Sequence, residues 1–426
     1  MAFSFRPSTF NMLKPLLQQR SFNTFEPMVA ASTMANGADF KQSIRNQTRV
    51  STTLATHLLS KEPNSNVVFS PLSIHVVLSL LAAGSKGQTL YQLLAFLKTN
   101  TTHDLNSLYS RLVSSILADA SPNGGPRLHF ANGFWVDKTF TLKPSFQHLV
   151  DTVYNKAACK QVDFEKADEV AKEVDLWAAK QTNGLIKGVL PANVVSSRTG
   201  LLFANAVYFK GAWSKKFNES MTEKFDFHHL NGNKVRVPFM TSKEKQFVCE
   251  FSDFKVLGLP YLQGKGDHKF TMYFYLPDAK DGLPSLIQKM GITPDFLDNH
   301  IPYTAVPVGK FLIPKFKIAF EFEASNMLKE LGIVLPFRYG DDLTEIGNSS
   351  TGESPFVSGI HHKSFVEVNE EGTEVAAVTR AGFRTCDRPS YKKVDFVADH
   401  PFLYVIREDV TGVVLFMGQV VDPCVG

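Results

Sequence analysis

The chain has 426 residues, of which 44% are hydrophobic, and its formal net charge is +4. This length exceeds that of one average domain, and the composition supports a large apolar core. The small and evenly spread charge argues against a nucleic-acid partner. No apolar run reaches the roughly 18 residues of a membrane span. The sequence therefore predicts a globular protein that uses neither nucleic acid nor a membrane.

The four cysteines, Cys159, Cys249, Cys386 and Cys424, are far apart in the sequence. They form no CxxC pair, so no zinc or redox motif is present. Scattered cysteines without an apolar leader favour free thiols in a reducing, intracellular compartment. We expect no metal and no other cofactor.

Residues 1–38 differ in composition from the rest of the chain. They contain arginines and many polar uncharged residues, with no acidic residue before Glu26. Two interpretations stay open: a disordered extension, or a transit segment for an organelle. In either case we expect the folded domain to span residues 39–426, in the cytoplasm or in that organelle.

The first half of the chain shows mostly helical periodicity. Proline follows Ser70 at a predicted helix start, where its missing N–H costs nothing. That helix is apolar all round, which predicts burial. The predicted elements are helices at Arg49–Leu59, from Ser70-Pro71 onward, at Tyr91–Leu97, Leu105–Leu117 and Asp168–Thr182, with a strand at Leu128–Val136.

The second half favours strands, and the first of them, Leu201–Phe209, is nearly continuous in apolar residues and therefore central. Further strands are predicted at Val235–Phe239, Phe247–Leu257, Phe270–Leu276, Ala305–Ile318, Ser364–Asn369, Phe402–Ile406 and Gly412–Val420, and helices at Leu283–Met290 and Ala324–Leu331. The segment from Phe40 to Gly418 contains no linker and no internal repeat. Helices first and strands later indicate a single α+β domain.

One segment, Val366–Thr385, fits neither a plain strand nor a plain loop. It begins with the alternation of a half-buried strand and continues with small, strand-competent residues. It then enters a polar stretch before the strand at Phe402–Ile406. Such a long connection is usually functional or disordered. We expect a segment that can be either loop or strand, and whose conversion to strand releases free energy.

Six motifs occur in one order along the chain: NVVFSPLSI, FANAVYFKGAW, IPKFKIAFEF, HKSFVEVNEEGTE, DHPFLYVI and LFMGQVVDP. In these motifs the chain resembles the serpins, and within them the plant serpins, over about Phe40 to Pro423. The resemblance implies a five-stranded sheet, two further sheets, about eight or nine helices and an exposed reactive loop at about residues 370–395.

The same resemblance implies a mechanism. A serine or papain-like cysteine protease attacks the loop and forms an acyl-enzyme. The cut loop then inserts as a new strand into the five-stranded sheet. Such proteins are monomers in which loop–sheet polymerisation can occur.

The resemblance also assigns site residues to three regions and to a scissile bond. A polar cluster beneath the sheet, the shutter, matches Ser70, Ser73, Asn205 and His362. The entry point of the loop, the breach, matches Trp213 and Lys315. The hinge matches Glu370, Glu371, Gly372, Thr373, Glu374, Val375, Ala376, Ala377 and Val378. Counting from Glu370 places the reactive bond between Cys386 and Asp387, with Arg384 and Arg388 as alternatives.

The hinge departs from the small-residue pattern of inhibitory members at Val375, Val378 and Arg380. Because Val375 would face inward, we expect overpacking to slow insertion. The sequence therefore predicts a serpin whose inhibition is impaired or lost. The alternative is a functional inhibitor of a trypsin-like protease. No nucleophile–base motif of an enzyme occurs, so we expect no enzymatic activity.

Overall fold

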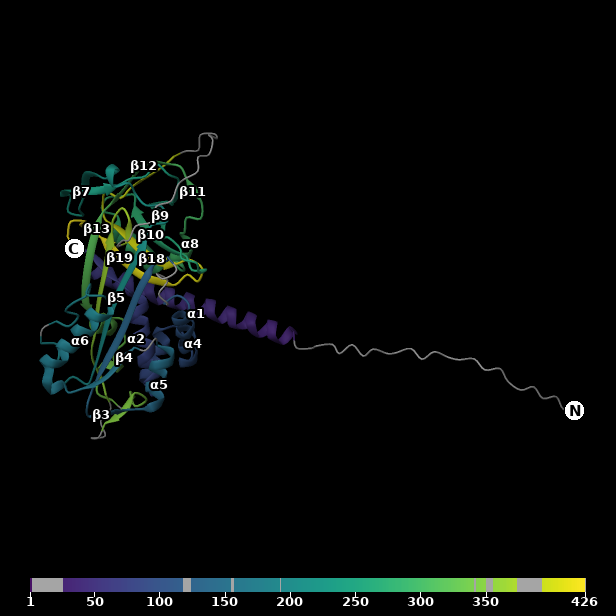
Figure 1. The fold of residues 1–426 in the computed structure, drawn as a ribbon, viewed down its shortest axis with the longest axis vertical. Coiled ribbons are helices and arrows are strands. Elements are labelled where there is room, and N and C mark those ends of the chain that lie inside the picture. Colours follow the sequence, from purple (N-terminus) through teal and green to yellow (C-terminus); the bar gives the residue numbers. More distant parts are fainter. Residues whose placement is uncertain are drawn as a thin grey trace. The chain divides into compact units, whose positions relative to one another are not determined.

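The computed structural model describes residues 1, 26–117, 124–154, 157–191, 193–340, 342–349, 355–373 and 393–425, with side chains, after Met1, from Asp39 onward. The chain divides into two compact units, Met1–Phe40 and Lys41–Gly426. Helix α1 (Glu26–Lys61) begins in the first and ends in the second, which holds the sheets (Figure 1). The boundary expected after residue 38 stays a prediction. No helix in the described ranges is long and apolar enough to cross a bilayer.

Helix α2 (Pro71–Ala83) forms as its sequence predicts. Pro71 occupies the first turn, and the Ser70 side chain accepts the backbone N–H of Ser73 at 3.3 Å. All residues from Pro71 to Ala82 are buried, so this helix runs through the core. The other helices of the second unit are α3 (Gly87–Phe96), α4 (Thr102–Ser114), α5 (Pro144–Val153), α6 (Ala167–Gln181), α7 (Leu283–Ile292), α8 (Phe296–Asn299) and α9 (Ala324–Glu330).

The strands form three larger sheets and one small one. The seven-stranded sheet has the order β1 (Val67–Phe69), β19 (Val414–Val420), β18 (Phe402–Glu408), β10 (Phe270–Pro277), β9 (Phe254–Pro260), β8 (Gln246–Glu250) and β11 (Ala305–Val306). The four-stranded sheet has the order β17 (Val394–Val397), β12 (Val308–Pro314), β7 (Lys234–Met240) and β6 (Glu223–His228). Strands β14 (Gly347–Ser349) and β3 (Phe140–Leu142) form the small sheet.

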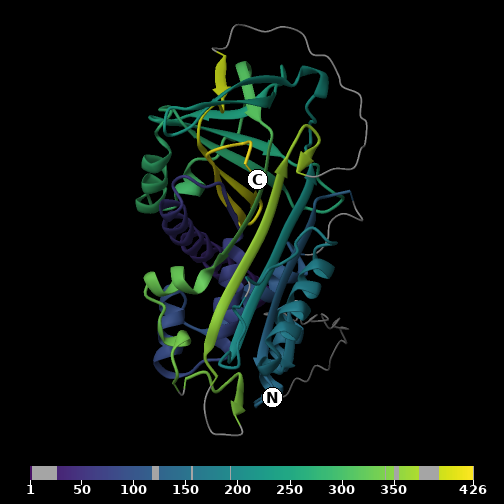
Figure 2. The ribbon, with the colours of Figure 1, turned by 90° about the vertical axis from the view of Figure 1, so that its left-hand side faces the viewer.

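The remaining sheet carries the hinge. Its order is β13 (Phe316–Glu323), β15 (Val357–Val368), β5 (Leu201–Ala212), β2 (Arg127–Asp137) and β4 (Ala158–Val162), and the short β16 (Gly372–Thr373) pairs with the end of β5. Figure 2 shows β15, in yellow-green, beside β5, in teal. These two strands are parallel and hydrogen-bonded directly from Val357–Leu201 to Phe365–Tyr208. The sheet is therefore closed between them over this length.

The two faces of β5 meet different surroundings. Phe209 packs against Tyr261 and Phe416 on the face toward the core. Ala204 and Ala206 lie on the opposite face, in an apolar cluster with residues of α6. Figure 1 shows α6 beside β5 and β4. Neither face of this part of β5 is open to solvent.

Two predicted strands are wrong in their extent. Phe247–Leu257 is not one strand but the hairpin β8–β9, because the chain turns where the N–H of Phe251 donates to the carbonyl oxygen of Phe254. Ala305–Ile318 is divided among β11, β12 and β13, which belong to three different sheets. The breaks fall at Pro307 and after Pro314, and proline cannot donate to a strand ladder.

Candidate functional site

The hinge begins with a tight turn after β15. The side-chain oxygen of Asn369 accepts the N–H of Glu371 at 3.1 Å and that of Gly372 at 3.2 Å. The Asn369 N–H donates to the carbonyl oxygen of Gly372 at 3.0 Å. Gly372 has a φ of +155°, and a Cβ there would lie 2.1 Å from the carbonyl oxygen of Gly211. Only glycine allows the chain to turn back this closely onto β5.

Past this turn, β16 is already paired. Gly372 lies opposite Ala212 and Thr373 opposite Gly211, in antiparallel register. Thr373 is 1% exposed, and its hydroxyl lies 2.8 Å from that of Tyr261. The first two residues of the expected new strand therefore occupy strand positions while β15 and β5 are still paired further along.

The carboxylate of Glu370 is held by two partners. Its side chain is 6% exposed and lies 2.7 Å from Lys315 Nζ, while Thr222 donates its hydroxyl to the other oxygen at 2.7 Å. Burial raises the pKa of Glu370, but the hydrogen bonds from Lys315 and Thr222 outweigh burial and leave the pKa below its ordinary value. The hinge glutamate is thus ionised and anchored.

Trp213 supports the same turn from the end of β5. Its backbone N–H donates to the carbonyl oxygen of Glu371, and its indole N–H donates to that of Asn369, both at 2.9 Å. Its ring stacks on Tyr261 with the centroids 4.7 Å apart. Lys216 forms an ion pair with the Glu371 side chain. The expected breach residues Trp213 and Lys315 therefore both contact the hinge.

The four expected shutter residues lie together beneath the sheet. The Ser70 N–H donates to His362 Nε2 at 3.1 Å, and the same ring nitrogen lies 2.9 Å from the Ser364 hydroxyl. Ser73 joins through its bond to Ser70. Asn205 lies directly opposite His362 in the β5–β15 register. All four are at most 1% exposed.

This cluster contains polar atoms that lack partners. His362 Nδ1, Asn205 Oδ1 and Ser73 Oγ are buried and have no hydrogen-bond partner among the described residues. Burial lowers the pKa of His362 to about 3, so its imidazole is neutral. Such unpaired atoms cost free energy in the closed sheet, and a second sheet arrangement that pairs them would be favoured.

Several expected site residues lie outside the described residues. They are Glu374, Val375, Ala376, Ala377 and Val378 of the hinge, Cys386 and Asp387 at the reactive bond, and its alternatives Arg384 and Arg388. Their assignments stay predictions. Cys159, Cys249 and Cys424, which are described, are free thiols.

Sequence reasoning missed six residues that complete these contacts: Thr222, Lys216, Tyr261 and Asn369 around the hinge, and Asn132 and Ser364 beside the shutter. Asn132 lies opposite Asn205 on β2 and accepts a hydrogen bond from its amide. No local pattern identifies most of these residues, because their roles depend on strand register between segments far apart in the chain.

Comparisons with known proteins agree with this geometry. The family model described as "Serpin (serine protease inhibitor)" matches residues 45–423. Serpin-ZX of Arabidopsis thaliana is 54% identical over 389 residues, which is 90% of this chain and 99% of that protein. Serpin-ZXA of Oryza sativa subsp. japonica is 49% identical, over 91% of this chain and 98% of its own length.

Solved structures show the same relationship. The Arabidopsis AtSerpin1 structure, described as a native stressed conformation, has a TM-score of 0.83 and 53% identity. The match covers 90% of this chain and 99% of that one. The fold, the family model and both plant relatives lead to one conclusion: this chain belongs to the serpin family.

Proposed function

We propose that this chain is a serpin whose reactive loop is attacked by a protease. The loop can insert into the sheet formed by β13, β15, β5, β2 and β4, but too slowly for efficient inhibition. The observation that carries this proposal is the register of β16, in which Thr373 lies opposite Gly211. Each further residue of the loop moves one position back along β5. Continuing the register therefore assigns Arg380 to the position opposite Ala204.

That position is unfavourable for a charge. Ala204 lies on the face covered by α6, and it is fully buried. The residue level with it on β15 is His361, which is 2% exposed and whose Nε2 has no partner in the described part of the chain. An arginine entering there must be desolvated or must extend its head group past α6. Either requirement raises the free energy of the inserting strand.

The register places a second misfit on the core face. Val375 is assigned to the position opposite Phe209, whose side chain is 1% exposed and packed against other aromatic rings. Two additional methyl groups relative to alanine cost about 1–3 kcal/mol in a well-packed core. This supports the expectation from sequence, and Arg380 adds an obstacle on the opposite face of the strand, which α6 covers.

Inhibition requires insertion of the loop to be faster than hydrolysis of the acyl-enzyme. An increase of about 1.4 kcal/mol in the insertion barrier slows insertion tenfold. With both misfits in the strand, we expect most attacked molecules to be released as cleaved substrate. The proposed reactive bond is Cys386–Asp387, with cleavage after Arg384 or Arg388 as the alternatives for a trypsin-like protease.

The second candidate function is efficient inhibition of a trypsin-like protease. The specific observation in its favour is the pairing of β16 with β5 before any cleavage. The first two residues of the new strand are in place, which shortens the remaining path. The aliphatic Val375 and Val378 also suit a strand.

Incubation with trypsin, and separately with papain, followed by denaturing electrophoresis separates the two candidates. The proposal expects mainly loop-cleaved protein and a minor band of covalent complex that survives boiling in SDS. Nearly complete conversion to complex at equimolar protease would establish the second candidate instead. A loop that neither protease cleaves, with no complex, would overturn both.

A further inference from the structure

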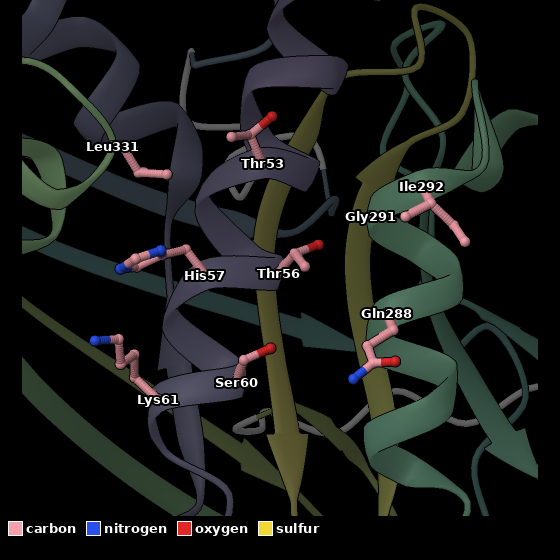
Figure 3. Close-up of a pocket in the computed structure, with 9 residues that line it drawn as sticks. All are labelled: Thr53, Thr56, His57, Ser60, Lys61, Gln288, Gly291, Ile292 and Leu331. Atoms are coloured by element: carbon pink, nitrogen blue, oxygen red, sulfur yellow. The ribbon is translucent and has the colours of Figure 1, made fainter.

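Two adjoining cavities lie between α1 and α7, away from the hinge and the shutter. The larger has a volume of about 610 Å³ and the smaller about 120 Å³. Ser60 and Gln288 line both, so the cavities are neighbours. In Figure 3 the side chains of Thr56 and Ser60 point from α1 toward α7. Volumes of a few hundred cubic ångströms are typical of small-molecule sites.

The smaller cavity has apolar walls together with three polar lining residues, Ser60, Gln288 and Gln419. Leu59, Leu283 and Ile287 contribute to its walls. Gln419, which is 0% exposed, also lines it. Its amide nitrogen donates to the carbonyl oxygens of Glu62 and Ser65, but its Oε1 has no donor among the described residues. A buried acceptor without a donor is uncommon and costly, so this cavity suits a ligand with an O–H or N–H group.

The larger cavity has one lysine in its lining, Lys61, whose ammonium is paired with Glu330. Its ionisable lining residues are His57 and Lys61, and none of the residues lining either cavity is acidic. Figure 3 shows both side chains directed to the Leu331 side of α1. Glu330, outside the lining, lies 2.7 Å from His57 and 3.1 Å from Lys61. Lys61 keeps 61% of its side chain exposed and retains further donor capacity for an anion.

We propose that these two cavities form one site for a small hydroxylated carboxylic acid with a compact apolar body. The body occupies the larger cavity, which extends from α7 along α1 to Leu331. The hydroxyl donates to Gln419 Oε1 in the smaller cavity, and the carboxylate lies near Lys61 at the open end. No covalent step is involved, and the site is independent of loop insertion.

Three probes isolate these features in isothermal titration calorimetry with the full chain. 6-Hydroxy-2-naphthoate has both groups, 2-naphthoate lacks the hydroxyl, and 2-naphthol lacks the carboxylate. We expect the first to bind at one site and about tenfold tighter than 2-naphthoate, because only the hydroxyl satisfies the buried acceptor. We expect it to bind roughly three- to tenfold tighter than 2-naphthol, because the carboxylate is partly exposed.

Variants test the location. Ser60→Trp fills the shared part of both cavities and should abolish binding, whereas Ser110→Trp, at an exposed serine of α4, should leave it unchanged. Lys61→Ala should weaken both naphthoates about three- to tenfold and leave 2-naphthol unaffected. Equal affinities for all three probes, or undiminished binding to a folded Ser60→Trp variant, would overturn the proposal.

Discussion

At the scale of single residues, His362 of the shutter makes the stability of the fold depend on pH. Its ring is buried, its Nδ1 lacks a partner among the described residues, and burial holds its pKa at about 3, against 6.5 when exposed. The unfolded chain therefore binds a proton that the folded protein does not, at every pH between these values. His75 is also buried and has a pKa lowered to about 3. The contribution of both groups to stability is full above pH 6.5 and decreases as the pH falls.

The first prediction follows from this decrease in stability as the pH falls. Between pH 7 and pH 5, each of the two histidines should remove about 2 kcal/mol from the free energy of unfolding. In His362→Gln, denaturant unfolding should show a loss smaller by about 2 kcal/mol, whereas the contributions of His75, His361 and His228, whose pKa values burial also lowers, remain. His148→Gln, at an exposed position of α5, serves as the matched control and should retain the full loss. Equal pH dependence in all three proteins would contradict this account of the shutter.

The second prediction concerns the anchored hinge glutamate. Lys315→Met leaves the Glu370 carboxylate, at 6% exposure, with Thr222 alone. Because Lys315 itself is 36% exposed, we expect a loss of about 1–3 kcal/mol, below the value for a fully buried pair. The control is Lys317→Met, which removes an exposed ion pair 3.5 Å long with Glu367 on the same sheet. That change should cost under about 1 kcal/mol. Similar losses in the two variants, measured by thermal unfolding, would show that the breach pair has no special role.

At the scale of elements, periodicity predicted the type and place of most helices and strands. The buried helix at Ser70-Pro71 and the central strand at Leu201–Phe209 both formed. Periodicity failed at Ala305–Ile318, because a strand pattern continues across a proline where the chain leaves one sheet for another. Periodicity also did not predict the pairing of β16 with β5, since a strand of two residues is too short to show a period. The shutter and breach were predictable only through the six motifs, whereas Tyr261 and Asn132 became visible with the register.

The third prediction tests the register of the inserting strand. Arg380→Ala removes the charge assigned to the buried face opposite Ala204. We expect a larger fraction of SDS-stable complex with trypsin, since each 1.4 kcal/mol removed from the insertion barrier speeds insertion about tenfold. Arg198→Ala, at an exposed arginine outside the loop, is the matched control. An unchanged fraction in Arg380→Ala would mean that this residue does not limit insertion, and that the register extended from β16 is wrong or Val375 dominates.

At the scale of the whole molecule, we propose that the fold has not reached its lowest free energy, since the β15–β5 ladder is closed and three shutter atoms lack partners among the described residues. A strand placed between β15 and β5 would add hydrogen bonds on both of its edges and bury further apolar surface. Asn205, whose Oδ1 has no partner among the described residues, would then face the inserted strand at the position assigned to Thr379. The hydroxyl of that threonine is a donor of the kind that the amide oxygen lacks.

The last prediction tests whether the intact protein stores such free energy. Protein nicked in the loop near Cys386 should melt roughly 10–20 °C above intact protein, since in a large domain each kilocalorie per mole raises the melting temperature by about 2 °C or somewhat less. The control is nicked Ala377→Pro, in which the missing N–H prevents the strand from pairing and the shift should disappear. A shift in the wild type together with little SDS-stable complex would show that the loop inserts, but more slowly than the acyl-enzyme is hydrolysed. No shift would mean that the loop stays out after cleavage, and the fold would then have kept the hinge pairing of the family without its mechanism.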